Sequence, residues 1–350
     1  MRNPAHLLSL ATASPPFQLD QTDVAAVAGE MFSLRYDDFE RLSKVFTTSG
    51  IETRQSVRPL DWYRQTLGWP ERTAAFIEGG EALFIEAAGR ALKAAGLSGA
   101  DVDTVVTVTS TGVATPSLEA RVSAAMGFRP DVSRVPVFGL GCAAGVSGLS
   151  IGARLAEARP GTNVLVVVIE LCTLSFRLDL LTKANIVATA LFGDGAAACV
   201  LRAGDGGLAS VEATGEHTWP DTLDVMGWAV DPMGFGVIFA QAIPPFARTK
   251  VGPAVSGILA NAGLSMAEID RFVCHPGGRK VVSSLESALA LESGTLDHER
   301  DVLREHGNMS SPTVLFVLER VLKQGLPDMT AITALGPGFT ASCAVLRRAA

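Results

Sequence analysis

The sequence predicts an α/β fold made of two similar halves, and an internal repeat is the main reason. Residues 95–110 (AGLSGADVDTVVTVTS) and residues 262–277 (AGLSMAEIDRFVCHPG) share a helix end, an acidic turn and a β-branched run. Runs of this kind are typical of buried strands. Strands that alternate with helical patterns indicate α/β layers, with helices on both faces of the sheets. The duplication predicts that the halves pack about a pseudo-twofold axis.

The repeat continues in each half with a glycine-led helical pattern, a strand and a closing segment that ends in Val-Leu-Arg. These elements fall at 141–158, 163–169 and 193–202, and again at 307–324, 330–335 and 338–347. We place the boundary at the start of a Gly-rich turn, so that residues 1–203 form the N-terminal half and residues 204–350 the C-terminal half. Residues 20–70, with helical patterns and a polar stretch, look like an insertion on the first half.

The composition excludes several classes of protein. A chain of 350 residues is long for one hydrophobic core, which agrees with two halves. With 48% apolar and 19% charged residues, it is not a disordered protein. A net charge of -7 argues against a nucleic-acid surface. No apolar stretch approaches the roughly 20 residues of a membrane span, and the first ten residues lack the apolar core of a signal peptide. We expect a soluble, cytoplasmic protein.

Five scattered cysteines suggest reduced thiols and no disulfide framework or zinc site. They are Cys142, Cys172, Cys199, Cys274 and Cys343, with no CxxC pair among them. The simplest interpretation of each is a small buried hydrophobe. Cys142 stands apart, because a strand-like run at 135–138 leads into Gly139-Leu140-Gly141 and then into a helical pattern. A thiol at a helix N-terminus has a lowered pKa and is a better nucleophile.

Two further residues stand where the repeat makes them candidates for catalysis. His275 ends a predicted strand before Pro-Gly-Gly, and active sites of α/β sheets gather at such strand ends. A hydrogen-bonded structural histidine is the simpler interpretation of His275 alone. Asn308 occupies the position in the second half that Cys142 holds in the first. The simpler role for Asn308 is a cap on the following helix.

Five motifs, in this order, carry a resemblance to a known family. They are GLGCAAGVSGL (139–149), ALFGDGAAA (190–198), CHPGGRKV (274–281), HGNMSSPTVLFVLE (306–319) and GPGFTA (336–341). Over almost its whole length the chain resembles type III polyketide synthases, the chalcone-synthase-like family, and its bacterial members most. This implies a thiolase-like fold with five αβαβα layers. The family's Cys–His–Asn triad falls on Cys142, His275 and Asn308.

The resemblance also implies a reaction and a set of substrates. Members of the family are acyltransferases that make secondary metabolites by repeated decarboxylative Claisen condensation of malonyl-CoA onto an acyl-CoA starter. Cys142 would carry the acyl group, while His275 and Asn308 would stabilise the enolate. The substrates are CoA thioesters, and no metal or redox cofactor is implied. By the same resemblance we expect a homodimer.

Other site residues are expected from the same resemblance. Phe192 falls on a gatekeeper phenylalanine, and the second gatekeeper is replaced, with Val237 the nearest residue. The cavity is expected to be lined by Thr111, Thr115, Cys172, Ser175, Trp228, Val237 and the Gly336-Pro337-Gly338 loop. Candidates for binding CoA phosphates are Arg54, Arg58, Gly277, Gly278 and Lys280. A solvated surface charge is the simpler interpretation of each cation.

Most of the expected cavity residues are small, which favours a long aliphatic starter. We therefore expect a fatty acyl-CoA starter and an alkylresorcinol or alkylpyrone product, although Trp228 is a bulky exception. Two alternatives stay open. A β-ketoacyl-ACP synthase III-like enzyme also uses Cys, His and Asn, but performs one condensation with an acyl carrier protein. A thiolase-fold protein without catalytic activity would act only as a binding partner.

Overall fold

The computed structural model describes residues 3–204 and 206–349. The strands are β1 (Ala5–Ala13), β2 (Phe17–Asp20), β3 (Thr53–Ser56), β4 (Thr104–Thr109), β5 (Ser133–Phe138), β6 (Val164–Leu171), β7 (Asp194–Ala203), β8 (Ala209–Thr218), β9 (Met226–Asp231), β10 (Gly234–Phe239), β11 (Arg271–Cys274), β12 (Met329–Gly336) and β13 (Thr340–Arg348). The helices are α1 (Gln21–Phe32), α2 (Phe39–Thr48), α3 (Trp69–Ala94), α4 (Leu118–Arg121), α5 (Ser123–Met126), α6 (Ala144–Ala158), α7 (Lys183–Leu191), α8 (Ile243–Asn261), α9 (Arg279–Ala288), α10 (Asp297–His306) and α11 (Thr313–Gln324).

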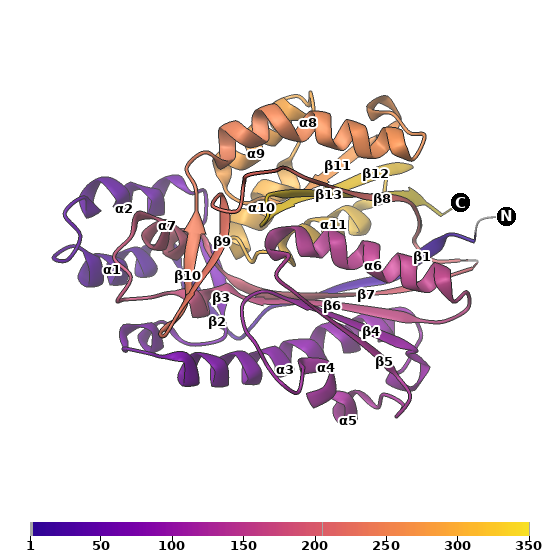
Figure 1. Ribbon diagram of the computed structural model, residues 1–350, viewed down its shortest axis with the longest axis horizontal. Coiled ribbons are helices and arrows are strands. Elements are labelled where there is room, and N and C mark those ends of the chain that lie inside the picture. The colour runs from indigo at the N-terminus through magenta and orange to yellow at the C-terminus, as the bar shows by residue number, and fades with distance from the viewer. Residues whose placement is uncertain (1–2, 205, 350) are drawn as a thin grey trace.

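The layers are those that the sequence predicts. Within the described residues, nine strands follow the order β11-β12-β13-β8-β1-β7-β6-β4-β5. The join between β1 and β8 consists of two residue pairs, His6 with Ser210 and Leu7 with Ala209. Figure 1 shows the strands on either side of this join as two stacked layers, with α6 and α11 between them, α8 and α9 outside one layer and α3 outside the other. The expected αβαβα arrangement is confirmed.

The internal repeat corresponds to matching strands. In the first half β4 lies parallel to β6, and β6 antiparallel to β7. In the second half β11 lies parallel to β12, and β12 antiparallel to β13. The strand β5, on the sheet edge beside β4, has no counterpart among the described strands. β7 ends at Ala203 and β8 begins at Ala209, and the domain boundary between residues 203 and 204 stays a prediction.

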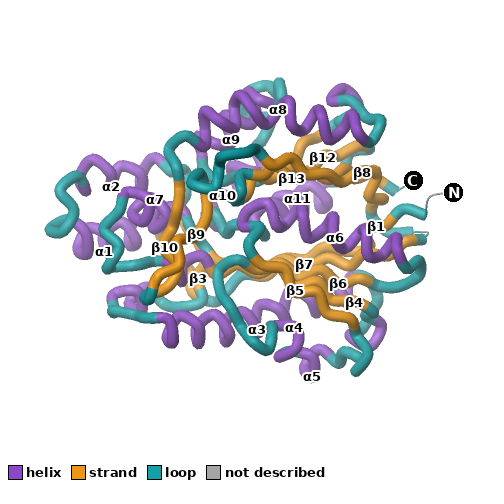
Figure 2. The backbone as a smooth tube through the Cα atoms, viewed as in Figure 1, coloured by secondary structure: helices purple, strands orange, loops and turns teal. Residues whose placement is uncertain are grey.

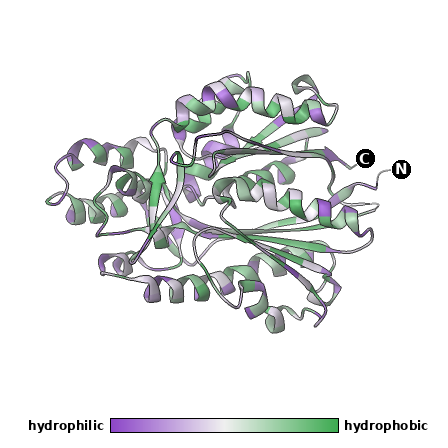
Figure 3. Cartoon of the chain, viewed as in Figure 1, coloured by the Kyte–Doolittle hydropathy of each residue, from purple (hydrophilic) through white to green (hydrophobic). Residues whose placement is uncertain are grey.

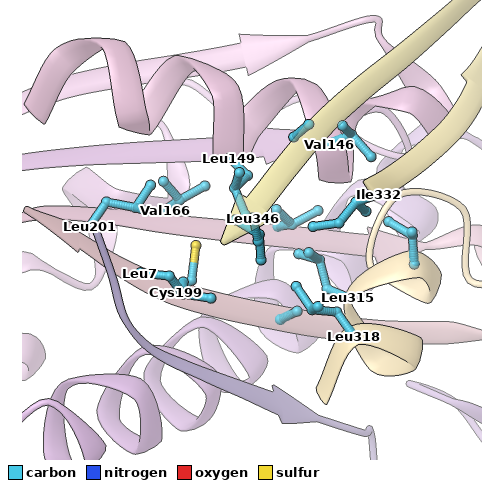
Figure 4. Packing of buried hydrophobic residues seen from close by; sticks show 14 of the residues in the cluster. Leu7, Val146, Leu149, Val166, Cys199, Leu201, Leu315, Leu318, Ile332 and Leu346 are labelled. Carbon is cyan, nitrogen blue, oxygen red and sulfur yellow. The ribbon is translucent and has the colours of Figure 1, made fainter. Parts of the chain in front are cut away.

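The main core lies between the two sheets. Figure 4 shows Val146 and Leu149 of α6 and Leu315 and Leu318 of α11 among side chains from both sheets. Glycines let α6 approach its neighbours closely: a Cβ atom at Gly152 would lie 2.5 Å from Val166 Cγ2. Figure 3 shows hydrophilic residues mainly on the outer helices and their loops. Among the described residues, no helix combines the length and apolarity needed to cross a bilayer.

A group of smaller elements covers one end of the layered body. It contains α1, α2 and α7, the two-stranded β2–β3 sheet and the β9–β10 hairpin, as Figure 2 shows. The segment that the sequence suggests as an insertion, residues 20–70, supplies α1, α2 and β3. Phe32, Phe46 and Ile186 join α1, α2 and α7 in an apolar cluster of their own. These elements supply part of the walls of the cavities described next.

Candidate active site

Cys142 lies in a single 3-10 turn, Gly141–Ala143, immediately before α6. The turn needs glycine first, because Gly141 has a φ of 49° and a Cβ atom there would lie 2.5 Å from Pro337 Cδ. The backbone N–H of Gly141 donates to Ser110 Oγ at 3.0 Å. The Cys142 thiol lies 3.4 Å from Ser310 Oγ. Cys142 therefore stands at a helix N-terminus after a tight glycine turn, the position that the sequence predicts.

His275 follows β11, and its side chain is buried without a hydrogen-bond partner. Its backbone N–H donates to the carbonyl oxygen of Thr333 at 2.9 Å, which continues the pairing of β11 with β12. The side chain is 5% exposed, and neither ring nitrogen has a partner among the described residues. Buried polar atoms are nearly always paired in folded proteins. Two unpaired ring nitrogens in a cavity indicate groups kept free for a substrate.

Asn308 is fixed by four hydrogen bonds. Its backbone N–H donates to Leu191 O at 2.8 Å, and its carbonyl oxygen accepts from Gly193 N–H at 3.0 Å. Its side chain donates from Nδ2 to Gly277 O at 3.2 Å and accepts at Oδ1 from Ser310 N–H at 2.8 Å. Because α11 begins only at Thr313, with Pro312 in the cap position, the interpretation of Asn308 as its cap is wrong. One N–H of the Asn308 amide remains for another acceptor.

One cavity brings these three side chains together. Cys142, His275 and Asn308 all border it, and we call it the triad cavity. Its volume is about 20 Å³, and its other walls are largely apolar. Among the described residues, no group of three or more His, Cys, Asp or Glu side chains could bind a metal. The arrangement suits chemistry in which a thiol acts beside an imidazole and an amide donor.

Burial changes the acid–base properties of the site from those that the sequence suggests. Desolvation raises the pKa of the Cys142 thiol to about 12, although the Ser310 hydrogen bond opposes the shift. Desolvation also lowers the pKa of His275 to about 3. Burial therefore opposes the low pKa that the sequence suggests for Cys142, and the thiol and the imidazole are both neutral at pH 7. A thiolate arises only if the thiol proton passes to another acceptor, His275 or solvent.

Three more cavities adjoin the triad cavity in a row. The hairpin cavity, about 40 Å³, shares Cys142, Met226 and Phe239 with it. The deep cavity, about 30 Å³, shares Cys172 and Phe192 with the hairpin cavity. On the other side, the outer pocket of about 800 Å³ shares its walls Phe239, Ile243, Gly277 and Val281 with the triad cavity. The site thus runs from an open mouth, past the triad, to a deep apolar end.

Several predicted cavity residues do border these spaces. Cys172 and Phe192 stand between the hairpin and deep cavities, and Ser175 borders the deep cavity. Trp228, Val237 and Pro337 border the hairpin cavity. Phe192 and Trp228 meet edge to face, with ring centroids 6.2 Å apart. The walls nearest Cys142 are therefore more aromatic than the small residues in the prediction suggest.

Other predicted cavity residues lie elsewhere. Thr111 turns its hydroxyl to Glu170 at 2.8 Å, and its neighbour Ser110 borders the hairpin cavity instead. Thr115 is exposed and borders none of the four cavities. Gly336 packs beneath the nucleophile turn, where a Cβ atom would lie 2.5 Å from Leu140 O. Gly338 has a φ of 107° and shapes the turn without bordering a cavity. For these four residues the prediction of a cavity-lining role is wrong.

Phe239 is an aromatic wall that the sequence analysis missed. It borders the triad cavity, the hairpin cavity and the outer pocket, so it stands where the three meet. The sequence analysis placed Val237 nearest to the position of the family's second gatekeeper phenylalanine, which is replaced in this chain. Of the four cavities, Val237 borders only the hairpin cavity. Residues two apart on a strand share a face. Because of this alternation along β10, the position of Val237 at the cavity also indicated that Phe239 faces the cavity.

Neither of the arginines predicted to bind CoA borders the outer pocket. Arg54 is 1% exposed, and it donates to the carbonyl oxygens of Thr189 at 2.8 Å and Phe192 at 3.0 Å. Burial lowers its pKa to about 9. Arg58 pairs with Glu78 of α3. The role of Arg54 is to hold the end of α7 and the backbone of Phe192 in place.

The outer pocket has other cations at its rim. Gly277, Gly278 and Lys280, which the sequence suggests as CoA-binding candidates, border it. The sequence analysis missed Arg41, Lys44, Lys183 and Arg279. Among the described residues, none of Lys44, Lys183, Arg279 and Lys280 has a carboxylate within ion-pair distance. Unpaired cations around one opening suit a ligand with several negative charges. Their segments, α2, α7 and α9, are far apart in the sequence, which hid the cluster.

Glu170 is a buried carboxylate that ties the turns of the site together. It is fully buried at the end of β6, and its Oε2 accepts from Ser110 N–H at 2.9 Å and Thr111 Oγ1 at 2.8 Å. Its Oε1 accepts from Ser311 Oγ at 2.8 Å. Desolvation raises its pKa to about 7, against these hydrogen bonds. The sequence signal was a lone acid in the apolar run VLVVVIEL.

Comparisons with known proteins agree on one family. The profile of the N-terminal domain of chalcone and stilbene synthases matches residues 69–205, and that of the C-terminal domain matches residues 211–350. The chain is 40% identical to a 1,3,6,8-tetrahydroxynaphthalene synthase of Streptomyces peucetius subsp. caesius, over 96% of this chain and 91% of that protein. It is 31% identical to an alpha-pyrone synthesis polyketide synthase-like protein of Mycobacterium tuberculosis, over 95% of this chain and 88% of that protein.

Solved structures give the same result. The fold matches the 1,3,6,8-tetrahydroxynaphthalene synthase of Streptomyces coelicolor A3(2), a bacterial type III polyketide synthase, with a TM-score of 0.93 and 25% identity over 99% of each chain. It also matches the C-terminal type III polyketide synthase domain of Steely1 from Dictyostelium, with a TM-score of 0.92 and 27% identity over 99% of this chain and 100% of that one. Both matches span the whole arrangement of layers.

Proposed function

The chain belongs to the chalcone and stilbene synthase family of type III polyketide synthases, and from this premise we propose that Cys142, His275 and Asn308 are its catalytic residues. As a member of that family it is an acyltransferring enzyme that acts on CoA thioesters. The observation that carries the proposal is the triad cavity, in which the three side chains meet next to a cationic mouth.

Loading of the starter follows from the neutral thiol and imidazole. His275 takes the thiol proton of Cys142 as the sulfur attacks the carbonyl carbon of the acyl-CoA. The carbon–sulfur bond to CoA breaks, and the CoA thiolate leaves with the proton that His275 holds. The acyl group is then a thioester on Cys142. The low pKa of His275 makes the imidazolium a strong acid, so it gives up this proton readily.

Extension uses the hydrogen-bond donors that the site keeps free. Malonyl-CoA loses CO₂, and the electrons of the broken carbon–carbon bond form an enolate at the thioester. The remaining N–H of the Asn308 amide and an N–H of His275 stabilise the enolate oxygen. The enolate carbon attacks the acyl carbon on Cys142, the Cys142 thiolate leaves, and a lengthened β-ketoacyl-CoA results. Return of this product to Cys142 allows another cycle.

We propose that the starter is a fatty acyl-CoA. The row of hairpin and deep cavities supports this, because it offers an apolar path beyond Cys142. Leu19, Val24 and Phe176 line the deep end. Phe192 stands between the two cavities and would have to rotate aside for a long chain to pass. The products would then be alkylresorcinols or alkylpyrones, and the alpha-pyrone relative agrees with this proposal.

A short starter is the second candidate, and the identity to a tetrahydroxynaphthalene synthase favours it. A naphthalene ring system carries no alkyl tail, so it is built without a fatty starter. The bulk of Trp228 and Phe192 beside Cys142 also suits short chains. The two candidates differ in whether the deep cavity is used at all.

A starter panel tests these proposals. The purified protein is incubated with malonyl-CoA and starters from acetyl-CoA to long-chain acyl-CoA, and products are identified by mass spectrometry. A fatty starter predicts multiply extended cyclic products whose yield rises with chain length and falls when Ser175→Trp fills the deep cavity. Products from malonyl-CoA alone would favour the second candidate. A single condensation that requires malonyl-ACP would support the β-ketoacyl-ACP synthase III-like alternative.

We propose that the outer pocket holds the CoA part of both substrates. Its unpaired cations, Lys44, Lys183, Arg279 and Lys280, match the phosphates of CoA in charge. Lys183→Ala should raise KM for malonyl-CoA with little change in kcat, since such binding is uniform across the reaction. We also propose a cytoplasmic location, because CoA chemistry and five free cysteines suit a reducing compartment.

We propose that the chain forms a homodimer through β5. This strand lies at the sheet edge, where unpaired backbone groups can add another strand. Phe138 at its end is 53% exposed and Val113 is 54% exposed. A twofold contact would pair β5 with its copy and cover both side chains. Light scattering should give twice the chain mass, and Phe138→Asp should lower it, whereas Leu34→Asp at the other end should not.

A further inference from the structure

The β9–β10 hairpin forms a wall of the cavities around Cys142 but belongs to neither large sheet layer. Met226 and Phe239 border the triad cavity, and Trp228 and Val237 border the hairpin cavity. Because the hairpin has no backbone pairing to the main sheet, side-chain contacts decide where this wall stands relative to Cys142.

Three polar contacts with other elements hold the hairpin, in addition to ring contacts of Phe235 with Trp69 and of Trp228 with Phe192. Near its base, Trp228 Nε1 donates to Ser110 O at 2.7 Å. At its tip, Trp69 Nε1 donates to Asp231 O at 2.8 Å. The Asp231 carboxylate lies with both oxygens 2.7 Å from Arg177 Nη1, and it also accepts from Met233 N–H at 2.8 Å. Asp231 therefore closes the hairpin turn and ties it to another segment.

Arg177 belongs to the segment that forms the opposite side of the cavities. This segment carries Cys172 and Ser175, which border the deep cavity. The guanidinium of Arg177 is 3% exposed and donates from Nε to Asp179 at 3.0 Å. Its backbone carbonyl accepts from Asn185 Nδ2 of α7 at 2.7 Å. The ion pair of Arg177 with Asp231 thus joins the cavity floor to the tip of the hairpin wall.

We propose that the Arg177–Asp231 ion pair is a clamp that sets the size of acyl chain the enzyme accepts. It holds the hairpin wall, with Trp228 and Val237, close to the floor at Cys172. Without it the tip can swing away, and the hairpin cavity widens. Both are positioning residues, since neither touches the reacting atoms. The inference rests on the polyketide synthase activity and holds for either starter class.

The chain offers a matched pair of variants. Asp231 and Asp179 both pair with Arg177, and their side chains are 39% and 41% exposed, but only Asp231 lies on the hairpin. Asp231→Asn loses the charge, while its amide oxygen can still accept from Met233 N–H and keep the turn. Asp179→Asn removes the same kind of ion pair without releasing the hairpin.

Hydrogen exchange without substrate is the first measurement. Asp231→Asn should speed exchange of the peptide covering residues 226–239 by about tenfold, and Asp179→Asn should leave it unchanged. The second measurement is the ratio of kcat/KM for the longest and shortest starters that the wild type uses. Asp231→Asn should shift this ratio about fivefold towards the longer starter, and Asp231→Glu should restore it.

The clamp is overturned if both variants speed exchange equally, or if the hairpin loosens while the starter ratio stays within about twofold of wild type. Because exchange is measured without substrate, failure of a proposed starter leaves that test of the clamp intact. The clamp is supported if Asp231→Asn, but not Asp179→Asn, both speeds hydrogen exchange in the hairpin and shifts the kcat/KM ratio towards the longer starter.

Discussion

At the scale of single residues, the Cys142–His275 pair gains its chemistry from burial and not from a preformed ion pair. Desolvation moves the pKa of the thiol up to about 12 and that of the imidazole down to about 3. Proton transfer from one to the other creates charge inside the cavity but exchanges no proton with solvent. The population of the thiolate–imidazolium pair is therefore independent of pH between these two pKa values, whereas the thiolate formed by loss of the proton to solvent rises about tenfold per pH unit.

This gives a pH prediction. Alkylation of Cys142 by iodoacetamide should speed up about tenfold per pH unit from pH 6 to pH 9, because a thiol with a pKa of about 12 must lose its proton to solvent. His275→Ala should keep this slope, because the neutral imidazole does not hold the thiol ionised in advance. The rate is followed by mass spectrometry of the Cys142 peptide. A rate that stays constant over this range in the wild type would indicate a preformed ion pair and would contradict the account of the pair.

The three residues of the predicted triad were easier to predict than the cationic residues expected to bind the phosphates of CoA. Cys142, His275 and Asn308 stand beside glycines and strand ends that mark them in the sequence. Arg54 looked like a surface cation, yet it serves the backbone of α7. A sequence does not reveal which arginine satisfies buried carbonyls, because its partners come from distant segments.

At the scale of elements, the strand β6 positions the catalytic turns through its last residues. Glu170 links the turn after β4 to the turn after Asn308. Since Ser110 also accepts the N–H of Gly141, the link reaches the nucleophile turn. One buried carboxylate thus keeps elements from both halves in register.

The role of Glu170 can be tested with a matched variant. In Glu170→Gln the amide N–H₂ faces other hydrogen-bond donors, which should lower the free energy of unfolding by about 1–3 kcal/mol. The turns that Glu170 holds would then be misplaced, which should lower kcat about tenfold. Glu286→Gln alters another buried glutamate, bound to Gly294 N–H and Arg300, and should lose stability without losing kcat. Equal kcat in both variants would refute a positioning role.

The elements around the cavities were harder to predict than the repeated layers. The walls combine residues from elements far apart in the sequence, among them α2, α7, α9 and the β9–β10 hairpin. The strand alternation of β10 is visible in the sequence, but its partner surface is not. Phe239 borders three spaces only because the hairpin folds over Cys142.

At the scale of the whole molecule, the two halves share a central layer that is packed at glycines. A Cβ atom at Gly145 of α6 would lie 2.2 Å from Ser311 O, at the start of the segment leading into α11. The duplicated order of elements predicts this layer, since each repeat supplies one of its helices. The close approach itself depends on how the halves dock, which no local pattern encodes.

Gly145→Ala should therefore destabilise the protein by about 1–3 kcal/mol through overpacking at the junction of the halves. At Gly89 of α3, by contrast, an added Cβ atom would meet nothing within 4 Å. Gly89→Ala should leave the free energy of unfolding unchanged or raise it by up to about 1 kcal/mol. Urea unfolding followed by circular dichroism measures both. Similar free energies of unfolding for the two variants would mean that the central layer accommodates the added methyl group at residue 145 without strain.

The most direct test of the account is to find where the acyl group is carried. The protein is incubated with an acyl-CoA starter alone, digested, and its cysteine peptides are weighed by mass spectrometry. The account predicts an acyl mass on Cys142 only, absent in Cys142→Ala and much slower to form in His275→Ala. An acyl group on Cys172, or acylation that persists in Cys142→Ala, would contradict it.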